Sequence, residues 1–161
     1  MKKILFFFLF LCIFLSAGAQ RAAKAMFFEI GGPGIASFNY DQRFFRKESG
    51  LGGRMGAGGF SFSFDGVREG IYFFPVGLNY LFGKDGKNYF ELGAGFTAVA
   101  LSGNRADGNN DFFEANFGHL NFGYRLQPAE GGFFFRAAIN PVFGYGIFFP
   151  YYGGVSFGYK F

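Results

Sequence analysis

Apolar and polar residues alternate along most of this chain with a period of two residues. In the segment 90–100, Phe90, Leu92 and Phe96 share one face, and Glu91 and Thr97 lie on the other. Successive side chains of a β-strand point to opposite faces, so this alternation predicts strands, and no segment shows the 3.6-residue period of a helix. Eight such segments predict eight strands, near residues 24–31, 35–45, 51–63, 71–83, 89–102, 116–127, 133–144 and 151–161.

The third segment changes phase part-way. Leu51 and Met55 share one face, whereas Phe60 and Phe62 fall on the opposite parity. Either a β-bulge at Gly58–Gly59 resets the alternation, or the strand is wrongly assigned.

The connections alternate in character. Short polar turns at one end and longer loops at the other are typical of an up-and-down transmembrane β-barrel. Segments of about 10 to 12 residues also suit a tilted crossing, which needs about 9–11 residues. The predicted turns are 46–50, 83–88 and 128–132, and the predicted loops are 65–70, 102–115 and 145–150.

A water-soluble β-sandwich also alternates, so the surroundings of the aromatic face decide between the two folds. Tyr40, Tyr80, Tyr124 and Tyr159 lie beside polar turns, as the aromatic girdles of a membrane barrel do. The sequence therefore predicts an all-β, eight-stranded antiparallel transmembrane barrel with its aromatic face toward lipid. A sandwich would instead pack four of these aromatic residues together in its core: Phe38, Phe96, Phe122 and Phe157.

The N-terminal segment predicts a cleavable signal peptide. Lys2 and Lys3 precede the twelve apolar residues 4–15, and Ala17-Gly18-Ala19 forms an A-x-A cleavage site. Cleavage after Ala19 divides the chain into a signal peptide, 1–19, and a barrel domain, 20–161. An uncleaved N-terminal anchor is the alternative, and Leu11 before Cys12 disfavours attachment of a lipid there.

Composition narrows the function further. The chain has 30 Phe, 9 Tyr and no Trp, and 16% charged residues, against about 25% in ordinary globular domains. The formal net charge is +4, of which Lys2 and Lys3 supply two units. Arg46-Lys47 is the only adjacent basic pair beyond them, so a nucleic-acid-binding role is excluded. The single cysteine, Cys12, lies in the predicted signal peptide, so no disulfide is expected.

The second face of the strands is small, polar or charged. A charge on the lipid face of a barrel costs about 2–4 kcal/mol at the bilayer midplane, so these charges should point inward. We interpret them as an ion network that fills the lumen, with ion or proton conduction as the alternative. The predicted lumen residues are Glu29, Asp41, Arg43, Arg54, Glu91, His119, Arg125, Arg136 and Lys160.

The end of the chain carries a family resemblance. Residues 155–161 end in Phe161, with Tyr159 and Phe157 at alternating positions before it. This ending, with segments 28–40 and 75–80, resembles small bacterial outer-membrane β-barrels of the outer-membrane protein A/X-like class, although those use Trp in their girdles. The resemblance implies a monomer in the outer membrane with both termini in the periplasm. It also implies contact with outer-membrane lipid and lipopolysaccharide, and recognition of Phe157, Tyr159 and Phe161 by the barrel assembly machinery.

Candidate chemistry is sparse. Some small barrels, the lipid A acyl-chain hydrolases, use a Ser-His-acid system, but His119 is the only histidine here and His119-Leu120-Asn121 is not followed by a serine. We therefore expect no enzyme. One histidine and no mature cysteine exclude a zinc site of the usual kind, and no cofactor is expected.

Two glycine-rich or acidic segments mimic ligand sites only in part. Segment 52–59 lacks the Lys-Ser/Thr ending of a phosphate-binding loop. Asp107, Asn109, Asp111 and nearby Glu114 partly mimic a calcium loop, but Phe112 occupies the place of its sharp-turn glycine, which favours an ordinary polar loop.

The sequence favours a structural or surface-interaction role. The alternatives are a narrow channel or carrier for small apolar solutes and, third, a lipid-modifying enzyme. One connection, Gly146–Tyr152, is unusually apolar. It is expected to enter the lipid headgroup region or to contact a ligand or partner; otherwise it marks a wrongly assigned strand.

Overall fold

A computed structural model describes residues 22–64, 67–103 and 116–161. Within these residues no helix is long and apolar enough to cross a membrane. The only helical element in this described part of the chain is one turn of 3-10 helix, η1 (Gly32–Gly34). The strands are β1 (Lys24–Gly31), β2 (Ala36–Arg43), β3 (Gly50–Phe64), β4 (Val67–Phe82), β5 (Asn88–Gly103), β6 (Phe117–Leu126), β7 (Gly132–Ile139), β8 (Val142–Gly144), β9 (Ile147–Phe149) and β10 (Gly153–Lys160).

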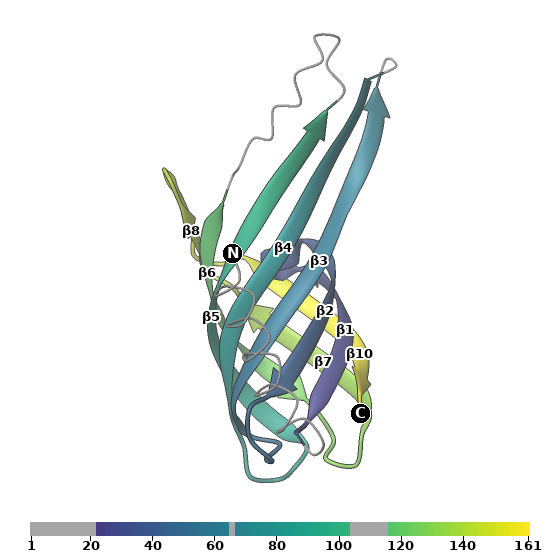
Figure 1. Ribbon diagram of the computed structural model, residues 1–161. Coiled ribbons are helices and arrows are strands. Elements are labelled where there is room, and N and C mark those ends of the chain that lie inside the picture. The colour runs from purple at the N-terminus through teal and green to yellow at the C-terminus, as the bar shows by residue number, and fades with distance from the viewer. Residues whose placement is uncertain (1–21, 65–66, 104–115) are drawn as a thin grey trace, which may run out of the picture.

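The sheet closes on itself. Neighbouring strands pair antiparallel from β1 through to β7, β7 pairs with β10, and β10 pairs with β1. The closing register places Phe28 opposite Phe157. Figure 1 shows the resulting barrel, with the C-terminus at the end that carries the short turns. The predicted all-β, eight-stranded antiparallel barrel is confirmed.

The seventh predicted strand, 133–144, is interrupted. Phe122 pairs with Ile139 and Phe117 pairs with Gly144, so β7 and β8 keep one register against β6. Asn140 and Pro141 separate them, and Pro141 has no backbone N–H to donate. Its carbonyl still accepts a hydrogen bond from the Leu120 amide, at 2.9 Å. The two strands therefore form one ladder with a proline break.

The predicted connection 145–150 is wrong, because part of it is a strand. β9 pairs with β8, placing Gly144 opposite Ile147, so the turn between them is only Tyr145–Gly146. Gly146 has a φ of 71°, a conformation that favours glycine. The apolar segment Gly146–Tyr152 therefore contains the second arm, Ile147–Phe149, of a β8–β9 hairpin. Figure 1 shows this hairpin leaning away from the barrel.

The bulge expected at Gly58–Gly59 is also wrong. Met55 pairs with Val76 and Gly58 pairs with Phe73, so no residue is inserted between the two pairs. The strand itself is correct, and the change of phase has another cause. β3, β4 and β5 are 15 or 16 residues long and continue beyond the barrel rim as a three-stranded extension (Figure 1). On this extension Phe60 and Phe62 share the inward parity of Arg54, and Phe60 packs 6.2 Å from Phe73, ring centre to ring centre.

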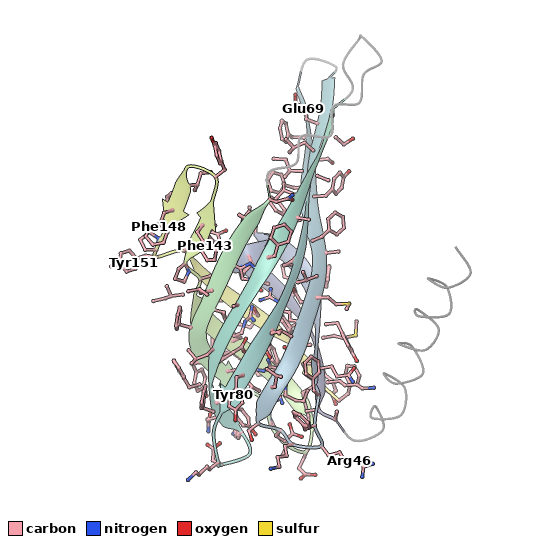
Figure 2. The ribbon with its side chains drawn as sticks, turned by 60° about the vertical axis from the view of Figure 1, so that its left-hand side comes forward. Arg46, Glu69, Tyr80, Phe143, Phe148 and Tyr151 are labelled. Carbon is pink, nitrogen blue, oxygen red and sulfur yellow. The ribbon has the colours of Figure 1, made fainter. Side chains whose placement is uncertain are left out.

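The outer surface of the barrel is apolar. Phe38, Phe96, Phe122 and Phe157 are 72%, 44%, 41% and 45% exposed and point away from the barrel axis. They do not form a common core, so the sandwich alternative is excluded. Tyr80 lies beside the turn end of the barrel in Figure 2, 4.5 Å from the ring of Phe82. In water, leaving one such side chain exposed forgoes about 1.5–3 kcal/mol, so this belt requires an apolar medium.

The turn between β4 and β5 is held by one carboxylate. Asp85 Oδ1 accepts hydrogen bonds from the backbone N–H of Lys87 at 3.0 Å and of Asn88 at 2.8 Å. Its Oδ2 accepts a bond from the Asn88 side chain at 2.6 Å. Because these donors favour the charged form, they lower the pKa of Asp85 to about 2.

We expect the Asp85 turn to persist in mild acid. The pKa is lower in the folded chain than in the unfolded chain, so the hydrogen bonds contribute in full above the ordinary aspartate pKa of about 3.9 and are lost as the pH falls towards about 2. An NMR titration of the Asp85 carboxyl carbon should give a midpoint near 2. A midpoint at the value of the unfolded chain would contradict this turn geometry.

Candidate functional site

The barrel lumen gathers the titratable residues predicted to lie inside. All nine side chains are at most 9% exposed. They come from the inward positions of β1, β2, β3, β5, β6, β7 and β10, because alternation places every second side chain of a strand on the inner face. The nine are Glu29, Asp41, Arg43, Arg54, Glu91, His119, Arg125, Arg136 and Lys160.

Asp41 occupies one end of the charge network. Its carboxylate accepts hydrogen bonds from Arg43 at 2.7 Å and from Arg125 at 2.8 Å. The amide of Asn79 donates to its second oxygen at 2.5 Å. Arg43 also donates to the backbone carbonyl of Gly50, at 2.9 Å. A carboxylate that would be costly to bury alone is thus paired on both oxygens.

Glu91 and Glu29 repeat the arrangement. Glu91 lies between Arg125 and Arg136, each with an N–O distance of 3.3 Å, and accepts a third bond from Asn121 at 2.8 Å. Glu29 accepts from Arg136 and Arg54. The seven charges therefore form one alternating chain across the lumen, in which every carboxylate lies between two guanidinium groups: Arg43–Asp41–Arg125–Glu91–Arg136–Glu29–Arg54.

Two buried aromatic rings support this chain and were not among the predicted lumen residues. Phe27 and Phe134 stack with their ring centres 4.7 Å apart. Arg136 lies 5.0 Å from the Phe27 ring centre, and Arg125 lies 4.8 Å from that of Phe134. Cations over aromatic faces are attracted electrostatically, and the attraction grows when water is excluded. The signal was present in the sequence, since Phe27 shares the parity of Glu29, and Phe134 that of Arg136.

The turn end of the lumen is closed by a residue from outside the strands. Glu48, in the connection between β2 and β3, accepts a bond from Lys160 Nζ at 2.8 Å. Its other oxygen accepts a bond from Gln127 at 3.0 Å. Lys160 is thus 5% exposed, and its partner is a turn residue that strand parity could not place there.

The opposite end is closed by η1. Pro33 is fully buried, and its carbonyl accepts a hydrogen bond from Thr97 at 3.1 Å. Gly32 has a φ of 65°, and a Cβ at this position would overlap Glu29 Oε1. Glycine therefore allows η1 to fold down onto the charge network.

Little space is left between these two closures. Among the described residues, a cavity beside the charge network holds about 10 Å³ and is lined in part by Arg54, Asn79, Glu91, His119 and Asn121. A single water molecule needs about this much room. The lumen is therefore filled by side chains along this part of its length.

Among the described side chains, the structure brings no serine hydroxyl within hydrogen-bond distance of His119. Its Nδ1 lies 3.4 Å from the Thr97 hydroxyl, and no other hydrogen bond to it occurs among the described side chains. Ser37 instead accepts a bond from Asn39 at 2.9 Å. The described part of the chain also has no group of three metal-ligating side chains. The calcium-like segment with Asp107, Asn109, Asp111 and Glu114, and the predicted signal peptide 1–19, lie outside the described residues.

Comparison with solved structures supports the architecture. The N-terminal β-barrel domain of Pseudomonas aeruginosa OprF matches with a TM-score of 0.56 and 15% sequence identity, over 88% of this chain and 98% of that chain. The chain has the fold of the outer-membrane β-barrels. Ail, the attachment invasion locus protein of Yersinia pestis, matches in its complex with the heparin analogue sucrose octasulfate with a TM-score of 0.52 and 12% identity, over 87% of this chain and 96% of that chain. No family model and no curated protein sequence matches this chain.

Proposed function

We propose that this chain is a closed, non-conducting β-barrel of a bacterial outer membrane, with a structural or surface-interaction role. The observation that carries the proposal is the alternating chain of seven charges, which fills the lumen and links six strands. A conducting lumen would need a continuous water-filled path, and the buried charge network, with a cavity of only about 10 Å³ beside it among the described residues, speaks against one. The same filling disfavours the alternative of a narrow channel or carrier.

The direction of the barrel in the membrane follows from its two ends. In outer-membrane barrels the short turns face the periplasm and the longer loops face outward. Lys24 and Lys160 lie at the short-turn end, so both ends of the barrel domain are periplasmic. The exposed aromatic side chains of the last strand, Phe157, Tyr159 and Phe161, then remain available to the barrel assembly machinery before the barrel closes.

The extension of β3–β5 then projects outward, beyond the membrane, with Glu69 near its tip in Figure 2. Beyond Tyr72 its outer face is small and polar, with Ser61, Ser63 and Ser102 exposed, as a surface in water would be. A rigid barrel that holds such an extension clear of the membrane suits contact with molecules at the cell surface. Contacts with outer-membrane lipid and lipopolysaccharide are made by the apolar belt below it.

Planar-bilayer recording tests the proposal. We expect the purified barrel domain, refolded until unheated samples migrate differently from heated ones on a gel, to show no stable single-channel openings. A refolded water-filled porin supplies the positive control. Regular openings of uniform size in most insertions would contradict a filled lumen and favour the channel alternative.

A further inference from the structure

The β8–β9 hairpin differs from a hairpin in water because both of its faces are apolar. Phe143 and Phe148 are paired on one face, and Val142 and Phe149 are paired on the other. Phe143, Phe148 and Phe149 are 44%, 68% and 63% exposed. A strand pair with one wet face shows alternation of polar and apolar residues, so neither face of this hairpin is suited to water.

The surrounding sequence carries no charge. Between Arg136 and Lys160 there is no Asp, Glu, Lys or Arg, whereas the sequence from 65 to 69 contains Asp65, Arg68 and Glu69. Tyr145 and Tyr151, at the ends of the hairpin, are almost fully exposed. Tyrosine is enriched at membrane interfaces, where its ring meets apolar material and its hydroxyl meets water.

The hairpin stands above the short side of the barrel. β1, β2, β7 and β10 have eight residues each, slightly fewer than the 9–11 of a full crossing. Because these strands are too short to cross the whole apolar layer of the proposed membrane, that layer extends past the end of β7 to the start of β8. Figure 2 shows Phe148 and Tyr151 directed sideways, away from the barrel wall, rather than upward with the extension.

A groove lies on the outer surface at the base of this hairpin. It holds about 580 Å³. Ile139 and Gly153, which form the last β7–β10 pair before the hairpin, both line it. Small residues such as Ala137 and Gly153 leave room between the larger side chains of Ile30 and Phe122, and none of the described residues that line the groove is charged.

We propose that the groove and the β8–β9 hairpin together bind one acyl chain of a membrane lipid at the outer end of the barrel. The groove is continuous with the apolar belt and takes the hydrocarbon chain. The hairpin lies over the interfacial region, where its tyrosines face the headgroup. This inference rests on the proposed membrane location, and the experiments below separate failure of one from failure of the other.

The position of the hairpin is testable because the chain has no tryptophan, so an introduced one is the only reporter. Three single variants are compared: Phe148→Trp in the hairpin, Phe38→Trp in the belt and Phe62→Trp on the extension. Each is refolded into phosphatidylcholine vesicles with or without bromine atoms on the acyl chains. Bromine should quench most of the emission of Phe148→Trp and Phe38→Trp, and little of that of Phe62→Trp.

The outcomes distinguish the two proposals. Quenching of Phe38→Trp but not of Phe148→Trp would overturn the lipid site and leave the membrane location intact. Absence of quenching in both, in refolded protein, would overturn the membrane location as well.

The groove is tested by filling it. A Cβ on Gly153 meets only one atom within 4 Å, the Ala138 carbonyl oxygen at 3.9 Å, so Gly153→Leu places its side chain in the groove without a clash at its base. Ala94→Leu, on the exposed outer face of β5, is the matched control. Native mass spectrometry of detergent-extracted protein should show a lipid adduct on wild type and Ala94→Leu, and its loss from Gly153→Leu. Retention of the adduct in all three, its absence from wild type, or a dimer abolished by Gly153→Leu would overturn the proposal.

Discussion

Replacing Arg136 by leucine should destabilise the folded barrel by about 3–5 kcal/mol, the usual result of removing one partner from a buried ion pair. Arg136 is the link between Glu91 and Glu29, and it also lies over the ring of Phe27. Without it each of the two carboxylates keeps a single arginine, Arg125 or Arg54, and loses a charge-assisted hydrogen bond in a site without bulk water. Urea unfolding of the protein in lipid vesicles, followed by the gel shift between folded and unfolded forms, measures the loss.

The matched control is Lys84→Leu, in the exposed turn between β4 and β5. It also exchanges a cation for leucine, but a surface substitution of this kind is worth only about 0.5 kcal/mol either way. Equal unfolding midpoints for the two variants would contradict the role of Arg136 in the lumen. A milder loss in Arg136→Lys than in Arg136→Leu would show that charge carries part of the effect and that the two-pronged guanidinium geometry carries the rest.

The faces of the strands could be predicted from sequence because their period is two. Once Glu29 is assigned to the lumen, Phe27 and Ala25 must follow it inward, and the same argument places Phe134 beside Arg136. Treating all aromatic residues as lipid-facing hid this consequence. Two phenylalanines inside the barrel contradict a simple division into aromatic and charged faces, but they give the arginines apolar surfaces to lie on.

The pairing within the lumen could not be predicted in the same way. Which carboxylate meets which arginine depends on the stagger of the strands around the barrel, and alternation carries no information on stagger. Asp41 meets Arg125 across 84 positions of the chain, and Glu29 meets Arg136 across 107. The contact of Glu48 with the lumen could not be predicted for a related reason. A turn residue has no strand parity, so the direction of its side chain cannot be derived from alternation.

The two local errors have a common origin, which is a change of surroundings along a strand. In the proposed membrane location, the alternation in β3 inverts beyond Gly58 because the strand leaves the apolar layer there, so that its apolar residues change from the outer to the inner face. The alternation in β9 is hidden because both faces of the hairpin are apolar. In each case the pattern reports the medium around the strand, whereas the hydrogen-bonded ladder continues unchanged.

The second substitution with a large expected effect on stability is at a glycine where β10 pairs with β1 and closes the barrel, called here the closing seam. Gly158 in β10 lies opposite Phe27 in β1, where the last strand meets the first. A Cβ there would overlap the Met26 carbonyl oxygen and lie 2.5 Å from Phe27 Cα, closer than real Cβ contacts allow. Gly158→Ala should therefore push β10 away from β1 and cost at least the 1–3 kcal/mol or so of an overpacked core.

Gly153→Ala, on the same strand, isolates this effect. Both substitutions add one methyl group to β10, but the Cβ of Gly153 meets nothing closer than 3.9 Å. The control should unfold at nearly the wild-type urea concentration, whereas Gly158→Ala should unfold earlier and yield less of the fast-migrating folded band on refolding. Phe27 stacks on Phe134 and underlies Arg136, so a displaced β1 also disturbs the charge network. Equal urea unfolding midpoints for the two alanine variants would mean that β1 and β10 can separate enough to accept the methyl group. Barrel closure would then not depend on the close contact between the backbones of β1 and β10.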